Sequence, residues 1–129
     1  MKTLIIMALS ALFAVAPQHF SAGPTPDDFR IASDKTEAGI RTIVAVPAPL
    51  VCCSKISIKI DVKTTKIESL VINGGCPGNG KAVASLLKGL TVQQAVQKID
   101  GIQCGDKGTS CTDQIARILK KSFPKNSGR

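Results

Sequence analysis

The stretch SKISIKIDV (residues 54–62) decides the fold, because its apolar and polar side chains alternate strictly. A period of two residues is typical of a β-strand with one buried face and one wet face. The segment KTT (63–65) suits a turn, and KIESLVI (66–72) has the composition of a second strand. Together these segments predict an antiparallel hairpin.

Three short helical patterns follow the hairpin. The first covers residues 81–88. The second opens on a capping box, in which the side chains of Thr91 and Gln94 each satisfy the other residue's free backbone N–H. The third begins near residues 110–112 and stops by Pro124, since proline cannot continue a helix. These patterns predict three helices.

The order of the elements indicates the fold class. The segment RTIVAVP (41–47) is apolar enough to add a strand to the hairpin. Strands precede helices, and there is no strand–helix alternation of the kind that builds a parallel sheet. We therefore expect an α+β domain, with a small antiparallel sheet of two to three strands followed by three short helices packed on one face.

The N-terminus has the pattern of an export signal. Residues 4–16 form an uninterrupted apolar run, shorter than the ~20 residues of a membrane span but suited to a signal-peptide core. We therefore predict a signal peptide over residues 1–22, an exported or periplasmic protein, and no stable transmembrane span in its mature form. If the start is misassigned, the protein is cytoplasmic.

The remaining residues divide by composition. Residues 23–39 are polar and punctuated by proline and glycine, and we predict that residues 23–45 form a linker or N-terminal extension. Residues 46–123 hold the periodic segments and form the predicted domain, and residues 124–129 form a frayed tail.

The net charge of +8, from 17 Lys and Arg against 9 Asp and Glu, favours anionic partners in general. The chain has no Trp, no Tyr and only four Phe. Aromatic side chains that would stack on bases are therefore scarce, and no reading helix or zinc finger is recognisable. We interpret the charge as a solvated basic surface and expect no specific nucleic-acid binding.

Two familiar functional patterns, a phosphate-binding loop and a catalytic dyad with histidine, each lack a residue that they require. Residues 75–81 fit the phosphate-binding pattern G-x-x-x-x-G-K, but Ala82 stands where a Ser or Thr would bind Mg²⁺, so we predict no nucleotide. The only histidine, His19, lies in the predicted signal peptide, which removes any mature Cys–His or Ser–His dyad. We predict no catalytic residues and no catalysis by this chain alone.

The cysteines carry the strongest chemical signal. All five stand at the boundaries of predicted elements, where separate loops can converge at one end of a sheet; they are Cys52, Cys53, Cys76, Cys104 and Cys111. Four converging thiolates suit Zn²⁺ or an iron–sulfur cluster. Export favours disulfides instead, and an odd number would leave one thiol over. Scattered free thiols are the third alternative, and connectivity cannot be read from the pattern.

Several ordered motifs resemble the TSCPD-domain family. They are CSK (53–55), GGCPGN (74–79), LLKGLTV (86–92) and GIQCGDKGTSCTDQIA (101–116), and the similarity runs over residues 51–121. The motif that names the family is altered here, because Thr112 stands where the family usually has proline. Proline would pre-set the first helical turn, so its loss affects rigidity and removes no ligand.

The resemblance implies a small stand-alone member of a family whose domain also occurs at the C-terminus of cobalamin-dependent ribonucleoside-diphosphate reductases. The large catalytic barrel of those enzymes cannot fit in 129 residues. By position, Cys53, Cys76, Cys104 and Cys111 match the cysteines of the family's motifs. We predict these four as the metal ligands, with Cys52 as a possible substitute. The order of elements is similar to that of iron–sulfur cluster scaffold proteins, at the level of fold alone.

Three functional hypotheses follow. The first is a metal-binding accessory or scaffold domain that holds Zn²⁺ or an iron–sulfur cluster and works with a protein partner, a reductase or a cluster acceptor. The second is a component of a ribonucleoside-diphosphate reductase. The third is an exported binding protein stapled by disulfides.

Overall fold

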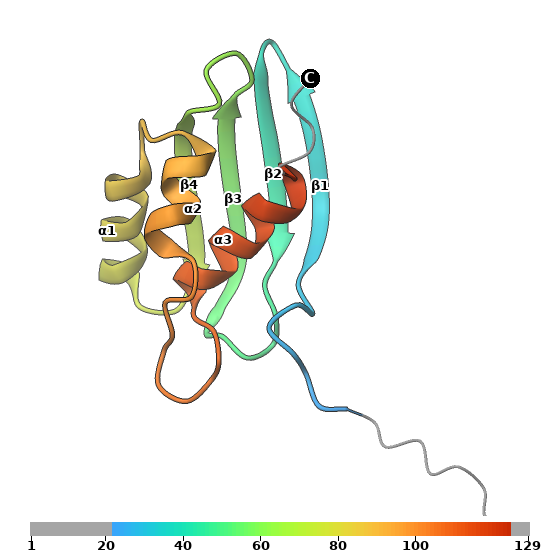
Figure 1. Ribbon diagram of the computed structural model, residues 1–129, viewed down its shortest axis with the longest axis vertical. Coiled ribbons are helices and arrows are strands. Elements are labelled where there is room, and N and C mark those ends of the chain that lie inside the picture. Colours follow the sequence, from blue (N-terminus) through green and yellow to red (C-terminus); the bar gives the residue numbers. More distant parts are fainter. Residues whose placement is uncertain (1–21, 125–129) are drawn as a thin grey trace, which may run out of the picture.

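The computed structural model describes residues 22–124. Four strands come first and three helices follow, so the α+β prediction is confirmed. The strands are β1 (Arg30–Glu37), β2 (Ile40–Val46), β3 (Cys53–Asp61) and β4 (Ile67–Gly74). The helices are α1 (Pro77–Leu87), α2 (Val92–Ile99) and α3 (Cys111–Ser122). In Figure 1, α2 and α3 cross the front of the sheet, and α1 runs beside β4.

The strands form one sheet in the order β1-β2-β3-β4, and every neighbouring pair is antiparallel. The prediction of two to three strands was wrong, because β1 and β2 both pair. Residues 23–45, predicted to be a linker or extension, therefore contain β1 and most of β2. The β1 strand lies at the sheet edge and is mostly exposed, so it lacks the alternation that reveals a strand.

The β1–β2 connection depends on left-handed backbone. Glu37 pairs with Ile40, which leaves a two-residue loop of Ala38 and Gly39. Both loop residues have positive φ, of 48° and 79°. Two positive φ values match the right-handed twist of flanking strands, so this short loop joins β1 to β2 directly.

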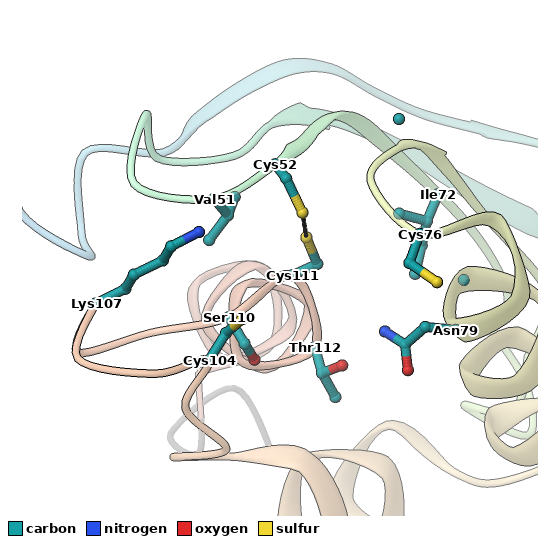
Figure 2. Close-up of a pocket in the computed structure, with 12 residues that line it drawn as sticks. Val51, Cys52, Ile72, Cys76, Asn79, Cys104, Lys107, Ser110, Cys111 and Thr112 are labelled. Atoms are coloured by element: carbon teal, nitrogen blue, oxygen red, sulfur yellow. Dashed lines mark hydrogen bonds between the residues drawn. The ribbon is translucent and has the colours of Figure 1, made fainter.

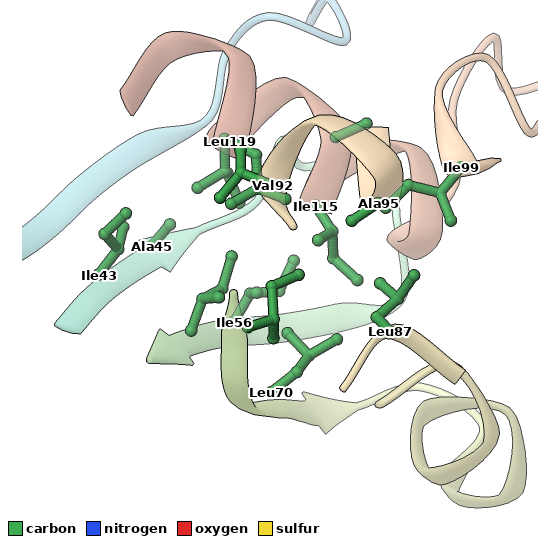
Figure 3. Packing of buried hydrophobic residues seen from close by; sticks show 14 of the residues in the cluster. Ile43, Ala45, Ile56, Leu70, Leu87, Val92, Ala95, Ile99, Ile115 and Leu119 are labelled. Atoms are coloured by element: carbon green, nitrogen blue, oxygen red, sulfur yellow. The ribbon is translucent and has the colours of Figure 1, made fainter. Parts of the chain in front are cut away.

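The alternating isoleucines of β3 form the centre of the core. Ile56, Ile58 and Ile60 are completely buried, as the pattern of residues 54–62 predicts. They face Ile115 and Leu119 of α3, which are also completely buried. Figure 3 shows α2 and α3 packing their apolar side chains against the sheet. Burial of these aliphatic side chains contributes about 1.5–3 kcal/mol per side chain to the stability of this contact.

The helix ends match the sequence signals with one exception. The Thr91–Gln94 capping box is present, and Ser110 caps α3 by accepting a hydrogen bond from the Asp113 N–H. The α1 helix begins at Pro77, four residues before the predicted start. Proline is favoured in the first helical turn because it has no N–H to leave unsatisfied. The two nearby glycines are more typical of a loop, so the sequence pattern did not reveal this first turn.

Among residues 22–124, no helix is long and apolar enough to cross a membrane. The predicted signal peptide falls almost wholly on residues 1–21, outside the described range, and so do residues 125–129 of the predicted tail.

Candidate functional site: a pocket lined by cysteines

A pocket of about 160 Å³ lies at one end of the sheet, where β3 begins, β4 ends, and α1 and α3 start. This convergence follows from the antiparallel pairing of Cys53 with Gly74, which places the start of β3 beside the end of β4. Four of the five cysteines line the pocket, and each comes from a different segment (Figure 2); they are Cys52, Cys76, Cys104 and Cys111. The fold therefore brings together thiols that are far apart in sequence.

Cys52 and Cys111 are in contact. Their Sγ atoms are 3.7 Å apart, and in Figure 2 the two side chains point at each other. Cys52 is exposed just before β3, whereas Cys111 is half-buried at the first residue of α3. This contact joins the sheet to the final helix at the pocket wall.

Gly75 closes over this pair of thiols. Its φ is +71°, and a β-carbon there would lie 3.1 Å from the Cys52 Sγ and 3.8 Å from the Cys111 Sγ. Gly74, also with positive φ, would meet the Cys52 carbonyl oxygen at 3.2 Å. Only glycine combines this backbone with such a close approach. The Gly-Gly pair before Cys76 therefore lets the loop after β4 lie directly against the thiols.

Cys53 has a different environment. Its side chain is only 5% exposed and belongs to the apolar core, and it does not line the pocket. Burial strongly raises the pKa of the Cys53 thiol, and hydrogen bonding and electrostatic interaction with Cys111 add to the rise. The Cys53 thiol therefore favours its protonated form beneath the pocket.

Cys111 is the thiol whose charged form is best supported. Its burial alone would raise its pKa, but hydrogen bonds from the Cys53 side chain and backbone, and then from Cys52, outweigh burial and lower the pKa of Cys111. The first residue of a helix also lies close to the positive end of the helix dipole. Lys107 adds a positive charge to the pocket lining.

The remaining two pocket cysteines lie on more open structure. Cys76 is exposed and occupies the N-cap of α1 without making a side-chain capping hydrogen bond. Cys104 is exposed in the loop between α2 and α3, where its N–H donates to the Thr109 carbonyl oxygen at 3.1 Å. Within residues 22–124, no three His, Cys, Asp or Glu side chains are grouped closely enough to hold a metal ion.

The segment around Cys111 is held by Asp113, which is only 1% exposed. Its Oδ1 accepts from the Gly101 N–H at 2.8 Å, and its Oδ2 accepts from the Thr109 hydroxyl and the Arg117 Nε, each at 2.7 Å. Burial alone would raise the pKa of Asp113, but the hydrogen bonds from Arg117, Thr109 and Gly101 lower it. The ionised carboxylate therefore fixes both ends of the loop that carries Cys104.

Gln114 fixes the opposite side of this segment. It is completely buried. Its Oε1 accepts from the Ala48 N–H, and its Nε2 donates to the Pro26 carbonyl oxygen and the Thr109 hydroxyl, over 2.9–3.0 Å. The sequence analysis missed this role, since a buried amide inside an amphipathic helix is not visible as a pattern. The start of α3 is thus tied to the segments before β1 and β3.

A comparison with protein families gives one match, the TSCPD domain, over residues 30–123. The chain belongs to the TSCPD family. The match begins at the first residue of β1 and ends just after α3, so this TSCPD domain includes most of residues 23–45, which the sequence analysis placed outside the domain. No curated protein and no solved structure matches the chain.

The TSCPD motif has a clear structural role in this domain. Thr109 and Ser110 are buried and hydrogen-bonded, Cys111 lines the pocket, and Asp113 binds the loop. Thr112, at the position where the family usually has proline, is buried in the first turn of α3. Of the predicted ligands, Cys76, Cys104 and Cys111 share the pocket, while Cys52 occupies it in place of Cys53. Their role as ligands stays a prediction.

Proposed function

We propose that this TSCPD domain binds a thiophilic metal, Zn²⁺ or an iron–sulfur cluster, and acts as an accessory or scaffold module. The observation that supports the proposal is the convergence of Cys52, Cys76, Cys104 and Cys111 on one pocket. Four thiolates without a histidine are the ligand set that structural zinc and iron–sulfur clusters prefer. Bound metal would supply a cross-link between the sheet and two helices.

The separation of Cys52 and Cys111 suits two ligands of one metal ion. Thiolates on tetrahedral zinc, with Zn–S bonds of about 2.3 Å, lie about 3.8 Å apart. The Sγ atoms of this pair are 3.7 Å apart. We therefore propose Cys52 and Cys111 as the first two ligands, with Cys52 in place of Cys53, whose side chain belongs to the core.

Cys76 and Cys104 complete the proposed ligand set from adaptable segments. Cys76 follows two glycines with positive φ, and Cys104 precedes Gly105, which also has positive φ. Such positions change conformation at low cost. Since no three of the described ligand-type side chains are already grouped for metal, the proposal requires these two segments to move inward on binding.

The charge around the pocket favours an anionic metal–thiolate centre. Four thiolates with a divalent ion carry a net charge of −2. The N-termini of α1 and α3 both begin at pocket-lining cysteines, and α1 has no acidic residue in its first turn. Positive helix ends stabilise nearby negative charge, and Lys107 on the pocket lining contributes a full positive charge.

Anaerobic purification of the full chain, followed by metal analysis, visible spectroscopy and thiol counting, tests the proposal. We expect one zinc ion or one cluster per chain, and an iron–sulfur cluster would be recognised by its visible charge-transfer absorption. Cys76→Ser and Cys104→Ser should each lower the affinity for metal by at least tenfold. Reduced wild-type protein that folds normally and binds neither zinc nor iron would overturn the proposal.

The reductase component and the exported location remain predictions from the sequence. The family match covers the domain and not a reductase barrel, and residues 1–21 lie outside the described structure.

A further inference from the structure

The contact between Cys52 and Cys111 also suits disulfide formation, which does not depend on metal. A disulfide has an S–S bond of about 2.05 Å, and the two Sγ atoms are 3.7 Å apart as free thiols. Closing the bond therefore requires the two Sγ atoms to approach by about 1.7 Å. The pair is separated by 59 positions in sequence, so this proximity is created by the fold alone.

Access to the two sulfurs is unequal. Cys52 is exposed, whereas Cys111 is half-buried at the start of α3. Gly75 is the residue that closes over Cys52, and it has no side chain to block it. Cys53, the sequence neighbour of Cys52, is buried in the core. A reagent from solution therefore reaches Cys52 first, and the Cys111 Sγ is in contact with the Cys52 Sγ.

We propose that Cys52 and Cys111 form a reversible disulfide by exchange with a low-molecular-weight disulfide, such as glutathione disulfide. The exposed Cys52 thiol gives up its proton and attacks one sulfur of the reagent, whose S–S bond breaks and releases one thiolate. The Cys111 thiolate then attacks the Cys52 sulfur and displaces the second small thiolate. Two electrons pass from the protein to the reagent, and the protons of the two protein thiols pass to the two released thiolates.

This disulfide would replace the metal-binding state, because it consumes the two cysteines that the proposed metal site needs most. It would also fasten the start of β3 to the start of α3 and close a long loop. Closing a long loop restricts the unfolded chain and stabilises the folded one. The two states thus make one pocket respond to the redox environment of the protein.

Treatment of the chelated, reduced full chain with excess glutathione disulfide tests the inference by intact mass and peptide mapping. We expect loss of two hydrogens and a Cys52–Cys111 cross-link, and the melting temperature should rise by about 10 °C or more and return on reduction. Cys111→Ser should leave a glutathione adduct trapped on Cys52. Cys76→Ser and Cys104→Ser, as matched controls, should keep the cross-link.

A cross-link through Cys53, Cys76 or Cys104 would overturn the inference, and so would wild-type protein that keeps a stable glutathione adduct on Cys52. Because the protein is free of metal throughout, failure here leaves the metal proposal standing. Conversely, a chain that forms this disulfide but never binds metal refutes the proposed function alone.

Discussion

A β-carbon on Gly75 would lie 3.1 Å from the Sγ of Cys52, at a backbone φ of +71°. This close approach makes the glycine before Cys76 part of the pocket, because its bare backbone allows the loop to lie against the thiol pair.

We predict that Gly75→Ala destabilises the domain and weakens the pocket. A non-glycine residue at positive φ costs about 1–2 kcal/mol, and the new methyl group would press on the Cys52 Sγ. Urea unfolding measures the loss. Gly78→Ala is the control, since it lies within α1 and its β-carbon would meet nothing within 4 Å. Equal effects of the two substitutions would contradict this account of Gly75.

Asp113→Asn should lower the free energy of unfolding by about 3 kcal/mol, because it leaves Arg117 without its buried partner and removes the charge that binds three donors. Asp100→Asn provides the control. Asp100 pairs with Lys120 where both side chains are over 40% exposed, and such pairs contribute under about 1 kcal/mol. Chemical denaturation of both variants checks the prediction, and a similar small loss in each would refute it.

The contribution of Asp113 should depend on pH in a defined direction. Its pKa is lowered in the folded protein, so the folded state binds the proton more weakly than the unfolded state, whose pKa is about 3.9. The stabilisation is therefore complete above that value and is lost as the pH falls through the lower folded pKa.

The stability difference between wild type and Asp113→Asn measures this dependence directly. The difference should be the same at pH 7 and pH 6 and should shrink when the pH falls below about 4. The other carboxylates contribute equally to the unfolding free energies of both proteins, so their pH dependence drops out of the difference. A difference that grows on acidification would show that the sign is wrong.

The capping box at α2 gives a prediction about folding alone. The Thr91 hydroxyl accepts from the Gln94 N–H at 3.2 Å, and the Gln94 side chain accepts from the Thr91 N–H at 3.0 Å. Thr91→Ala should cost about 1 kcal/mol of stability. Gln93→Ala, at an exposed position of the same helix, should change stability by less than about 0.5 kcal/mol. Thermal unfolding compares the two, and an unchanged melting temperature in Thr91→Ala would contradict the prediction.

The sequence predicted those elements whose pattern is local. Strict alternation revealed β3, and the Thr91–Gln94 box revealed the start of α2. The β1 strand escaped because an exposed edge strand buries little and carries no alternation. Its pairing with β2 depends on tertiary structure rather than on its own side chains.

The candidate site was predicted as a group of cysteines, and its internal geometry was not. The alternation that buries Ile56, Ile58 and Ile60 would, if extended back along the strand, put Cys52 on the core face. The register of β3 shifts between Cys53 and Lys55, so this extension fails. The structure places Cys53 in the core and Cys52 in the pocket. The hydrogen bonds that Asp113 and Gln114 make to distant segments likewise have no local signature.

Metal content measured side by side in anaerobically purified Cys52→Ser and Cys53→Ala tests the central claim most directly. The account predicts that Cys52→Ser loses stoichiometric metal, while Cys53→Ala retains it at one site per folded chain, with some loss of stability from the core cavity. The opposite pattern, with metal lost in folded Cys53→Ala and retained in Cys52→Ser, would contradict the assignment of Cys52 to the pocket's metal site.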